Sequence, residues 1–479
     1  MTTELLERVA AWHLEAKDDD DHYFFETRSS DAIQQGEKIF VIGRKGTGKT
    51  AICEHIHHSK AHDKFSVLQS FKNFPFNELY KFENEKFKSP NRYISIWKYA
   101  ILTALCRLML DNENVDGAAR AKLRRIFDFG VEDAFEKKLR KVTDRSFEIQ
   151  ILGTGIATEP VVLDHANEIP LDRRCEIIFD FLDGYLDESS YFILFDELDE
   201  DYRDVLVDTV GGNQYFELLV GLFKAAQEIH SYFSKRTKKV YPVVFLRDDI
   251  FDLLRDHDKP KWSDKSVDLN WSSTSLKDLL SFRISKARQP SQPAVPFDAA
   301  WKQLFSVQRT RVSNARQANT PTFSYLLRST YLRPRDLISY VRECAKVTLS
   351  VGKARVDNEI IKTAERKHSD FMRDELIAEM YSIVPEISEI LDMISEIRKP
   401  IITRKEFDDN YRNLQKRVGG KTASLPTQRI LELLYYFGAI GNVTTGNHQV
   451  YKHDSPRSKY NRRENISVHR SLLKTLDIY

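Results

Sequence analysis

The sequence predicts an α/β fold: a parallel sheet with a large helical insertion, followed by a helical lid subdomain and a C-terminal winged helix. Three observations lead to this fold class. Residues 43–50 read G-R-K-G-T-G-K-T and lie between an apolar, β-rich stretch (38–42) and a stretch with apolar residues at helical spacing. Residues 191–195 form a second apolar stretch, which ends in a cluster of carboxylates. Beyond these, helical periodicity dominates, and residues 379–479 combine helices with a hairpin.

The stretch 43–50 matches the phosphate-binding loop G-x-x-x-x-G-K-[ST], which is typical of P-loop NTPases. Its glycines let the backbone curl so that N–H groups point at phosphate oxygens, and the following helix adds the positive end of its dipole. Lys49 is expected to reach the β- and γ-phosphates, and the Thr50 hydroxyl to bind Mg²⁺. The predicted nucleotide-binding residues are Gly43, Arg44, Lys45, Gly46, Thr47, Gly48, Lys49, Thr50 and Ala51.

The amino-acid composition argues against several classes of protein. The chain has 479 residues, 30% of them charged, and a mean hydropathy of −0.47. No apolar run approaches the roughly 20 residues that span a bilayer, and residues 1–9 show no signal peptide. The four cysteines lie far apart, which favours reduced thiols and argues against a zinc site or a disulfide framework. We therefore expect a cytoplasmic protein with no membrane partner.

The order of elements predicts four regions. The chain from Lys49 to Asp196 is long for a compact ATPase core, so residues of about 75–187 are expected to be a helical insertion. The expected regions are an N-terminal helix (1–22), a P-loop ATPase core (23–290), a helical lid (291–378) and a winged helix (379–479).

Apolar spacing predicts the individual elements of the core. Strands beyond the two already named are expected at 65–69, 239–246 and 267–271, and alternation favours a hairpin at 147–158. Helices are expected at 4–16, 93–110, 118–127, 131–142, 172–186, 216–233 and 276–286, and in the lid at 297–305, 320–327, 333–351 and 358–372.

The carboxylates that follow residues 191–195 read D-E-L-D-E. Ligands bind at the C-terminal ends of parallel strands, so Asp196 is placed to hold Mg²⁺ through water. Hydrolysis also needs a carboxylate that orients and deprotonates the attacking water. Glu197 follows Asp196 directly, and Glu200 completes an alternative D-x-x-D-E pattern, so either glutamate is a candidate base.

Arg247 follows the strand predicted at 239–246. A polar residue at the tip of a strand beside the carboxylate strand can sense the γ-phosphate. The acidic residues after it, Asp248 and Asp249, can instead cap a short helix.

The terminal region predicts a winged helix. Helices are expected at 386–397, after the capping box Thr403-x-x-Glu406, at 426–437 and at 467–476, with a hairpin of 440–443 and 448–453. The helix at 426–437 is largely apolar. Residues 401–479 carry 14 Lys or Arg and 7 Asp or Glu, and many of the cations lie in and after the wing. We therefore expect mainly protein docking by this domain, with weak, sequence-independent DNA contact as a second possibility.

The motifs occur in a characteristic order: the phosphate loop, F-I-L-F-D-E-L-D-E, F-L-R-D-D-I, R-P-R-D-L and the winged helix. In this the chain resembles the bacterial and archaeal P-loop ATPases of the AAA+/STAND/KAP-like superfamily, often encoded beside antiviral defence genes. The resemblance implies ATP and Mg²⁺ as cofactors. It also implies that Arg333 or Arg335, in R-P-R-D-L, reaches back to the phosphates; the alternative is an exposed helix start.

Two functional classes compete. The first is an ATP-hydrolysing switch or sensor in antiviral defence, working as a homo-oligomer, with a separate effector protein, or both; no effector motif appears in this sequence. Its hydrolysis would use an arginine supplied on assembly, for which Arg247, Arg283, Arg333 and Arg335 are candidates. The second is a DNA-directed ATPase of the initiator or loader kind. A nucleotide-binding scaffold without turnover is a third reading.

Overall fold

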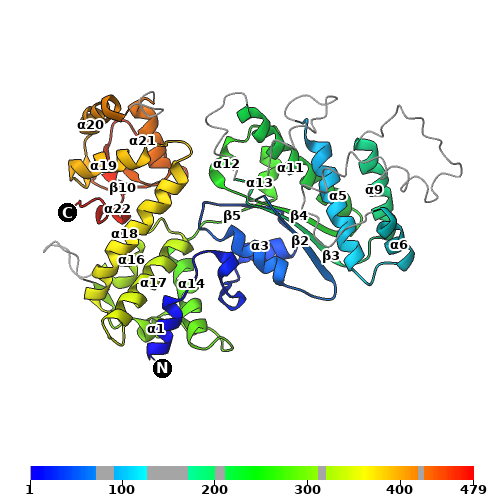
Figure 1. The fold of residues 1–479 in the computed structure, drawn as a ribbon, viewed down its shortest axis with the longest axis horizontal. Helices are drawn as coiled ribbons and strands as arrows, with labels where there is room; N and C mark the ends of the chain where they lie inside the picture. The colour runs from blue at the N-terminus through cyan, green and yellow to red at the C-terminus, as the bar shows by residue number, and fades with distance from the viewer. Residues whose placement is uncertain are drawn as a thin grey trace. The chain divides into compact units, whose positions relative to one another are not determined.

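The computed structural model describes residues 2–71, 91–126, 171–199, 211–310, 320–418 and 425–478. The chain divides into two compact units. Figure 1 colours the ribbon by residue number from the N- to the C-terminus. The sheet unit consists of residues 26–45 and 49–269, and the helical unit consists of residues 1–25, 46–48 and 270–479. The helix expected at 131–142 and the hairpin expected at 147–158 lie outside the described residues.

A five-stranded, fully parallel sheet forms the centre of the sheet unit and confirms the predicted α/β class. The strands lie in the order β2-β3-β4-β1-β5, so β4 separates the loop strand β1 from the carboxylate strand β3. A sheet covered on both faces needs strands that are apolar along their length, and β1 is buried throughout. The strands are β1 Phe40–Ile42, β2 Lys64–Ser70, β3 Ser190–Asp196, β4 Lys239–Leu246 and β5 Ser266–Asp268.

Helices cover both faces of this sheet. In Figure 1 α3 lies below the sheet, while α5 and α11 lie above it and pack against each other. The indole N–H of Trp97 in α5 donates to the carbonyl of Leu218 in α11 at 2.8 Å. The helices are α2 Arg28–Gln34, α3 Lys49–His58, α5 Ile94–Asp111, α6 Gly117–Ile126, α9 Leu171–Tyr185, α11 Gly211–Ser234, α12 Asp248–Leu253 and α13 Lys259–Asp264.

The helical unit joins the start of the chain to its second half. Helix α1 (Thr2–Ala10) packs against α14 and α17, and its Leu5, Leu6 and Val9 belong to their hydrophobic core. The helix expected at 4–16 therefore ends at Ala10, and a short 3-10 turn follows at Ala16–Asp18. The other elements are a 3-10 turn at Asp21–Tyr23, α14 Ser273–Arg288, α15 Phe297–Leu304, β6 Arg309–Thr310, β7 Thr320–Pro321, α16 Thr322–Leu327, α17 Pro334–Ser350 and α18 Asn358–Met380.

The end of the helical unit is the predicted winged helix. Its elements are α19 Ile387–Ile397, β8 Ile401–Ile402, α20 Arg404–Val418, α21 Thr427–Tyr436, β9 Ile440–Val443, β10 Gln449–Val450, β11 Asn465–Val468 and α22 Arg470–Leu473. The antiparallel sheet has the order β10-β9-β11-β8. Ser467 was expected to be helical, but it lies in β11 because it pairs with both Gly441 and Ile401.

Helix α18 contributes side chains to both hydrophobic cores of the helical unit. Ile360 and Ala364, near its start, pack in the core of α14 to α17. Met372, Leu376 and Met380, near its end, pack in the core of the winged helix. A fragment that begins at residue 380 would therefore lose part of the winged-helix core.

Three further observations concern the described residues alone. Among them, no helix is both long and apolar enough to cross a membrane. The four cysteines are buried and carry free thiols. No group of three or more His, Cys, Asp or Glu side chains comes together within the same ranges in a way that could hold a metal ion.

Candidate nucleotide-binding site

Two glycines give the phosphate loop its shape. Gly46 has a φ angle of +79° and Gly48 one of +100°, a region that other residues rarely adopt. A Cβ added at Gly48 would meet nothing within 4 Å, so the backbone angle rather than space requires glycine there. The loop starts at the end of β1 and runs into α3, which begins at Lys49. The strand–loop–helix context expected of a phosphate loop is present.

Lys49 lies inside this loop. Its Nζ donates to the carbonyl oxygens of Gly43 at 2.9 Å and Arg44 at 3.1 Å. Burial lowers the pKa of Lys49, while the carboxylates of Asp199 and Asp196 act to raise it. The loop lysine and the carboxylates that end β3 therefore belong to one electrostatic site.

Asp196 is the buried carboxylate of that site, with 4% of its surface exposed. Burial raises the pKa of Asp196 to about 6, although hydrogen bonds from the Glu197 N–H and the Thr50 hydroxyl favour its ionised form. Its Oδ2 is buried and has no hydrogen-bond partner among the described residues. A buried carboxylate oxygen that lacks a donor, next to a hydroxyl, suits a hard cation that prefers oxygen ligands. Thr50 and Asp196 therefore fit a site for Mg²⁺.

Glu197, the first residue after β3, has an unusual backbone conformation. Its φ angle of +61° lies in the left-handed region, which costs of order 1 to 3 kcal/mol for such a residue and often marks a functional site. Its carboxylate accepts a hydrogen bond from the hydroxyl of Ser70, the last residue of β2. Strand register explains the contact, because Ser70 pairs with Asp196. The other candidate base, Glu200, lies outside the described residues.

Arg247 sits at the tip of β4, between the loop strand and the carboxylate strand. Its Nε and Nη2 donate to the two carboxylate oxygens of Asp249 at 3.0 and 2.6 Å. Its Nη1 donates to Asp199 Oδ2 at 3.3 Å. Asp249 therefore does not merely start α12: it holds the arginine bidentately, the strong geometry for a guanidinium and a carboxylate. The sequence did not single out Ser70, because its contact depends on which strands lie side by side, and it indicated for Asp249 only a role as a helix cap.

Arg333 and Arg335 belong to the helical unit and have different surroundings. Arg333 is 1% exposed and forms ion pairs with Asp336 at 3.0 Å and Glu379 at 2.7 Å. Burial acts to lower the pKa of Arg333, but these two carboxylates raise it overall. Arg335 pairs with Glu15 at 2.8 Å and Glu375 at 3.3 Å. Arg333 is thus enclosed, whereas one partner of Arg335 is solvent-exposed.

The remaining candidate arginine, Arg283, is also buried. Its Nη1 lies 2.7 Å from Asp19, and its guanidinium carbon lies 5.0 and 4.6 Å from the ring centres of Trp12 and Tyr23. The structure therefore gives Arg283 a packing role that joins the start of the chain to α14.

Residues 46–48, the tip of the loop, group with the helical unit. Within that unit the Arg335 N–H donates to the Gly46 carbonyl at 3.4 Å, and the indole N–H of Trp271 donates to the Thr47 carbonyl at 2.9 Å. Of the predicted site residues, the sheet unit brings together Lys49, Thr50, Asp196, Glu197 and Arg247.

Comparison with known proteins gives three kinds of similarity. A family model described as the FunZ-associated C-terminal helical domain matches residues 274–377. A curated relative, the putative transposon gamma-delta 80.3 kDa protein of Escherichia coli K12, is 22% identical over 432 residues, which cover 85% of this chain. The chain spans 57% of the length of that relative.

Similar solved structures come from archaea. The Aeropyrum pernix Orc1 protein in complex with DNA is 13% identical with a TM-score of 0.36, covering 99% of this chain and 91% of that one. The Aeropyrum pernix Orc2 protein, solved as ADPNP–ADP complexes, is 11% identical with a TM-score of 0.38, covering 94% and 90%.

Proposed function

We propose that this chain is a Mg²⁺-dependent ATPase of the AAA+/STAND/KAP-like kind that works as a molecular switch or sensor. One observation carries the proposal: the loop lysine, Lys49, shares one buried electrostatic site with Asp196, whose Oδ2 lacks a donor among the described residues. Glu197 and Arg247 lie at the same edge of the sheet. A role in antiviral defence, with a separate effector, rests on the family resemblance alone.

Each group in the site has a separate role in the proposed hydrolysis. The loop N–H groups and Lys49 bind the phosphates, and Thr50 and Asp196 hold the cation. Bound Mg²⁺ offsets the negative charge that develops on the phosphoryl group. Glu197 takes the proton of the attacking water, and the Ser70 hydroxyl fixes the direction of its carboxylate. Arg247, tied to Asp199 and Asp249, lies where it can respond to the γ-phosphate.

Thermal stability tests the nucleotide site. ATP with Mg²⁺ should raise the melting temperature, because a ligand that binds only the folded state adds about 2.7 kcal/mol at a hundred times its dissociation constant. Lys49→Ala should remove most of this shift, because it deletes the charge on the β- and γ-phosphates. Lys60→Ala, which changes an exposed lysine outside the loop, is the matched control and should keep the shift. An unchanged shift in Lys49→Ala would refute the nucleotide assignment.

Assembly is a second part of the proposal. An arginine supplied across an interface is commonly worth about 10³ to 10⁵ in rate. Each candidate arginine already pairs with a carboxylate of its own chain. For a second copy or a partner protein to complete the site, one of these arginines would have to leave that carboxylate and contact the phosphates. Turnover per chain should rise with protein concentration or on adding the partner. A constant turnover by a monomer, verified by light scattering across the same concentrations, would contradict this part.

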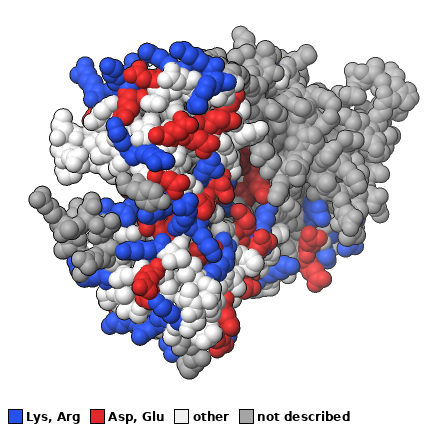
Figure 2. All heavy atoms as spheres, turned by 60° about the vertical axis from the view of Figure 1, so that its left-hand side comes forward, with Lys and Arg blue, Asp and Glu red and all other residues white. Residues whose placement is uncertain are grey.

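A DNA-directed ATPase remains the second candidate, and one surface favours it. Figure 2 shows Lys and Arg side chains gathered at the top of the face in view, over the winged helix. Four exposed cations between β10 and β11 form no ion pair within the described part of the chain: Arg457, Lys459, Arg462 and Arg463. The Escherichia coli relative is named for a transposon, a mobile DNA element, which is consistent with a DNA partner.

The helix α21 is poorly suited to read bases. Its Gln428 accepts a hydrogen bond from Arg404 and donates one to Glu432. Arg429 also lies 3.7 Å from Glu432. Tyr435 is core, since it is 2% exposed and its hydroxyl contacts Ser458. Few side chains of this helix are left for base edges, so sequence reading in the major groove is disfavoured.

Binding of the full chain to duplex DNA tests this candidate. We expect weak binding without sequence preference at about 150 mM salt, where nonspecific dissociation constants are about 10⁻⁴ to 10⁻⁶ M. The affinity for DNA should fall as the salt concentration rises. Replacing Arg462 and Arg463 with Gln should make the plot of log affinity against log salt concentration less steep. Nanomolar binding to one sequence, lost in the double variant Gln428→Ala and Arg429→Ala, would instead establish a sequence-reading helix.

A further inference from the structure

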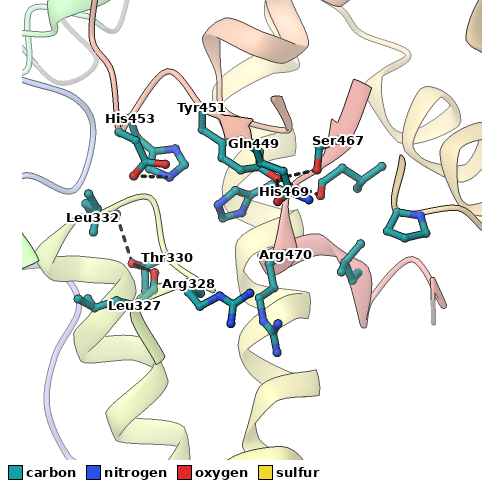
Figure 3. A pocket seen from close by; sticks show the side chains of 14 residues that line it. Leu327, Arg328, Thr330, Leu332, Gln449, Tyr451, His453, Ser467, His469 and Arg470 are labelled. Carbon is teal, nitrogen blue, oxygen red and sulfur yellow. Dashed lines mark hydrogen bonds and ion pairs between the residues drawn. The ribbon is translucent and has the colours of Figure 1, made fainter. Parts of the chain in front are cut away.

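A pocket of about 310 Å³ lies within the helical unit, and no residue of the phosphate loop lines it (Figure 3). One wall is the connection between α16 and α17, including Arg328 and Thr330. The opposite wall is the winged-helix sheet and the start of α22, including Tyr451, His469 and Arg470. Pockets of about this volume are typical of sites for small ligands.

Two arginines line this pocket. Figure 3 shows the guanidinium groups of Arg328 and Arg470 next to each other. Burial lowers the pKa of Arg328, and the charge of Arg470 lowers it further. Within the described residues the Arg328 side chain has neither an ion pair nor a hydrogen bond. Arg328 is exposed to solvent, and an anion bound beside both guanidinium groups would offset the repulsion between their charges.

One nearby carboxylate, Glu365, pairs with Arg470 but not with Arg328. Glu365 lies 3.6 Å from Arg470 and also accepts a hydrogen bond from the Tyr325 hydroxyl at 2.9 Å. The Arg470 guanidinium carbon lies 4.7 Å from the centre of the Tyr325 ring, so the tyrosine ring packs against this guanidinium. Asp454, on the pocket wall, lies 3.6 Å from His453. The groups that act on the Arg328 charge are Arg470 and two tyrosines, with no carboxylate among them.

The polar groups of the walls are already oriented. The Thr330 hydroxyl donates to the Leu327 carbonyl at 2.8 Å and accepts from the Leu332 N–H at 3.2 Å. The hydroxyls of Tyr451 and Ser467 lie 2.9 Å apart. A site whose side chains are held by their own hydrogen bonds loses little conformational entropy when a ligand binds.

We propose that this pocket binds a small phosphorylated ligand, with Arg328 and Arg470 holding a phosphate group between them. Guanidinium groups suit this ligand because their planar N–H donors match the geometry of phosphate oxygens. The hydroxyl-bearing wall offers hydrogen bonds to the rest of the molecule. None of the residues that line the pocket belongs to the phosphate loop or to the proposed nucleotide site, and the proposal does not depend on the proposed hydrolysis.

Calorimetric titration of the Lys49→Ala chain with pyrophosphate and with AMP tests the proposal, because this background removes binding by the phosphate loop. We expect saturable binding at one site per chain. Arg328→Gln should weaken it about tenfold or more, the loss of a charge-assisted hydrogen bond. Arg355→Gln, which changes an exposed arginine of the same unit outside the pocket, should leave the affinity unchanged. Arg328 has no described side-chain partner, so its replacement should not impair folding.

A second measurement does not require a variant. Modification of Arg328 by phenylglyoxal, followed by mass spectrometry, should slow when pyrophosphate is present, while modification of Arg355 should not. Absence of binding to the Lys49→Ala chain, or equal affinity in Arg328→Gln, would overturn the proposal. A 20-base-pair duplex that binds through Arg328 when pyrophosphate and AMP do not would also overturn it and assign the surface to nucleic acid.

Discussion

Glu197→Gln is expected to reduce ATP turnover by about 10² to 10⁴ while ATP binding persists. The amide keeps the shape of the side chain and can still meet the Ser70 hydroxyl, but it cannot accept the proton of the attacking water. Binding should persist because Lys49 and the loop N–H groups are unchanged. Steady-state phosphate release measures the first effect, and the ATP-dependent melting shift measures the second.

Glu200→Gln is the matched control for this experiment. If Glu197 is the base, the Glu200 variant should hydrolyse ATP at close to the original rate. Normal turnover by Glu197→Gln together with loss of turnover in Glu200→Gln would reverse the assignment and favour the D-x-x-D-E pattern. Loss of the melting shift in Glu197→Gln would show a binding defect instead, and would leave no support for a base at this position.

Arg333→Met is expected to lower the free energy of unfolding by about 3 to 5 kcal/mol, the usual result of removing one partner of a buried ion pair. Asp336 is 0% exposed and Glu379 8% exposed, so the change would leave two buried carboxylates without their cation. The Asp336 carboxylate also accepts from the Tyr331 N–H at 2.8 Å, which fixes the turn before α17. Urea unfolding followed by circular dichroism measures the loss.

Arg335→Met provides the contrast. One of its partners, Glu15, is 64% exposed, and ion pairs of this kind contribute about 0 to 1 kcal/mol. The variant should therefore unfold at nearly the original urea concentration. If ATP turnover nevertheless falls, Arg335 is the arginine that assists hydrolysis. Equal stability of the Arg333 variant and the unaltered chain would show that the buried acidic pair does not depend on that arginine.

The elements that carry the candidate site could be predicted because the patterns that encode them are local. The spacing of Gly43, Gly48 and Lys49 encodes the loop, and an apolar run followed by Asp196 encodes a buried strand with a carboxylate at its end. Each pattern lies within a few residues, where backbone conformation and hydrophobic periodicity decide the structure. Ser70 could not be found this way, because nothing in residues 64–70 marks the hydroxyl as the partner of a glutamate in another strand.

The sequence by itself determined the loop, the strands of the parallel sheet and most of the described helices, while the residues expected to bind phosphate and Mg²⁺ stay a prediction. Tertiary structure alone decided that β4 lies between β1 and β3, which sets the position of Arg247. It also decided that Arg333 lies between two buried carboxylates, and that Arg328 and Arg470 share a pocket. The physical reason is the same in each case. These contacts join segments far apart in the chain, and burial and pairing across such distances leave no local periodicity to read.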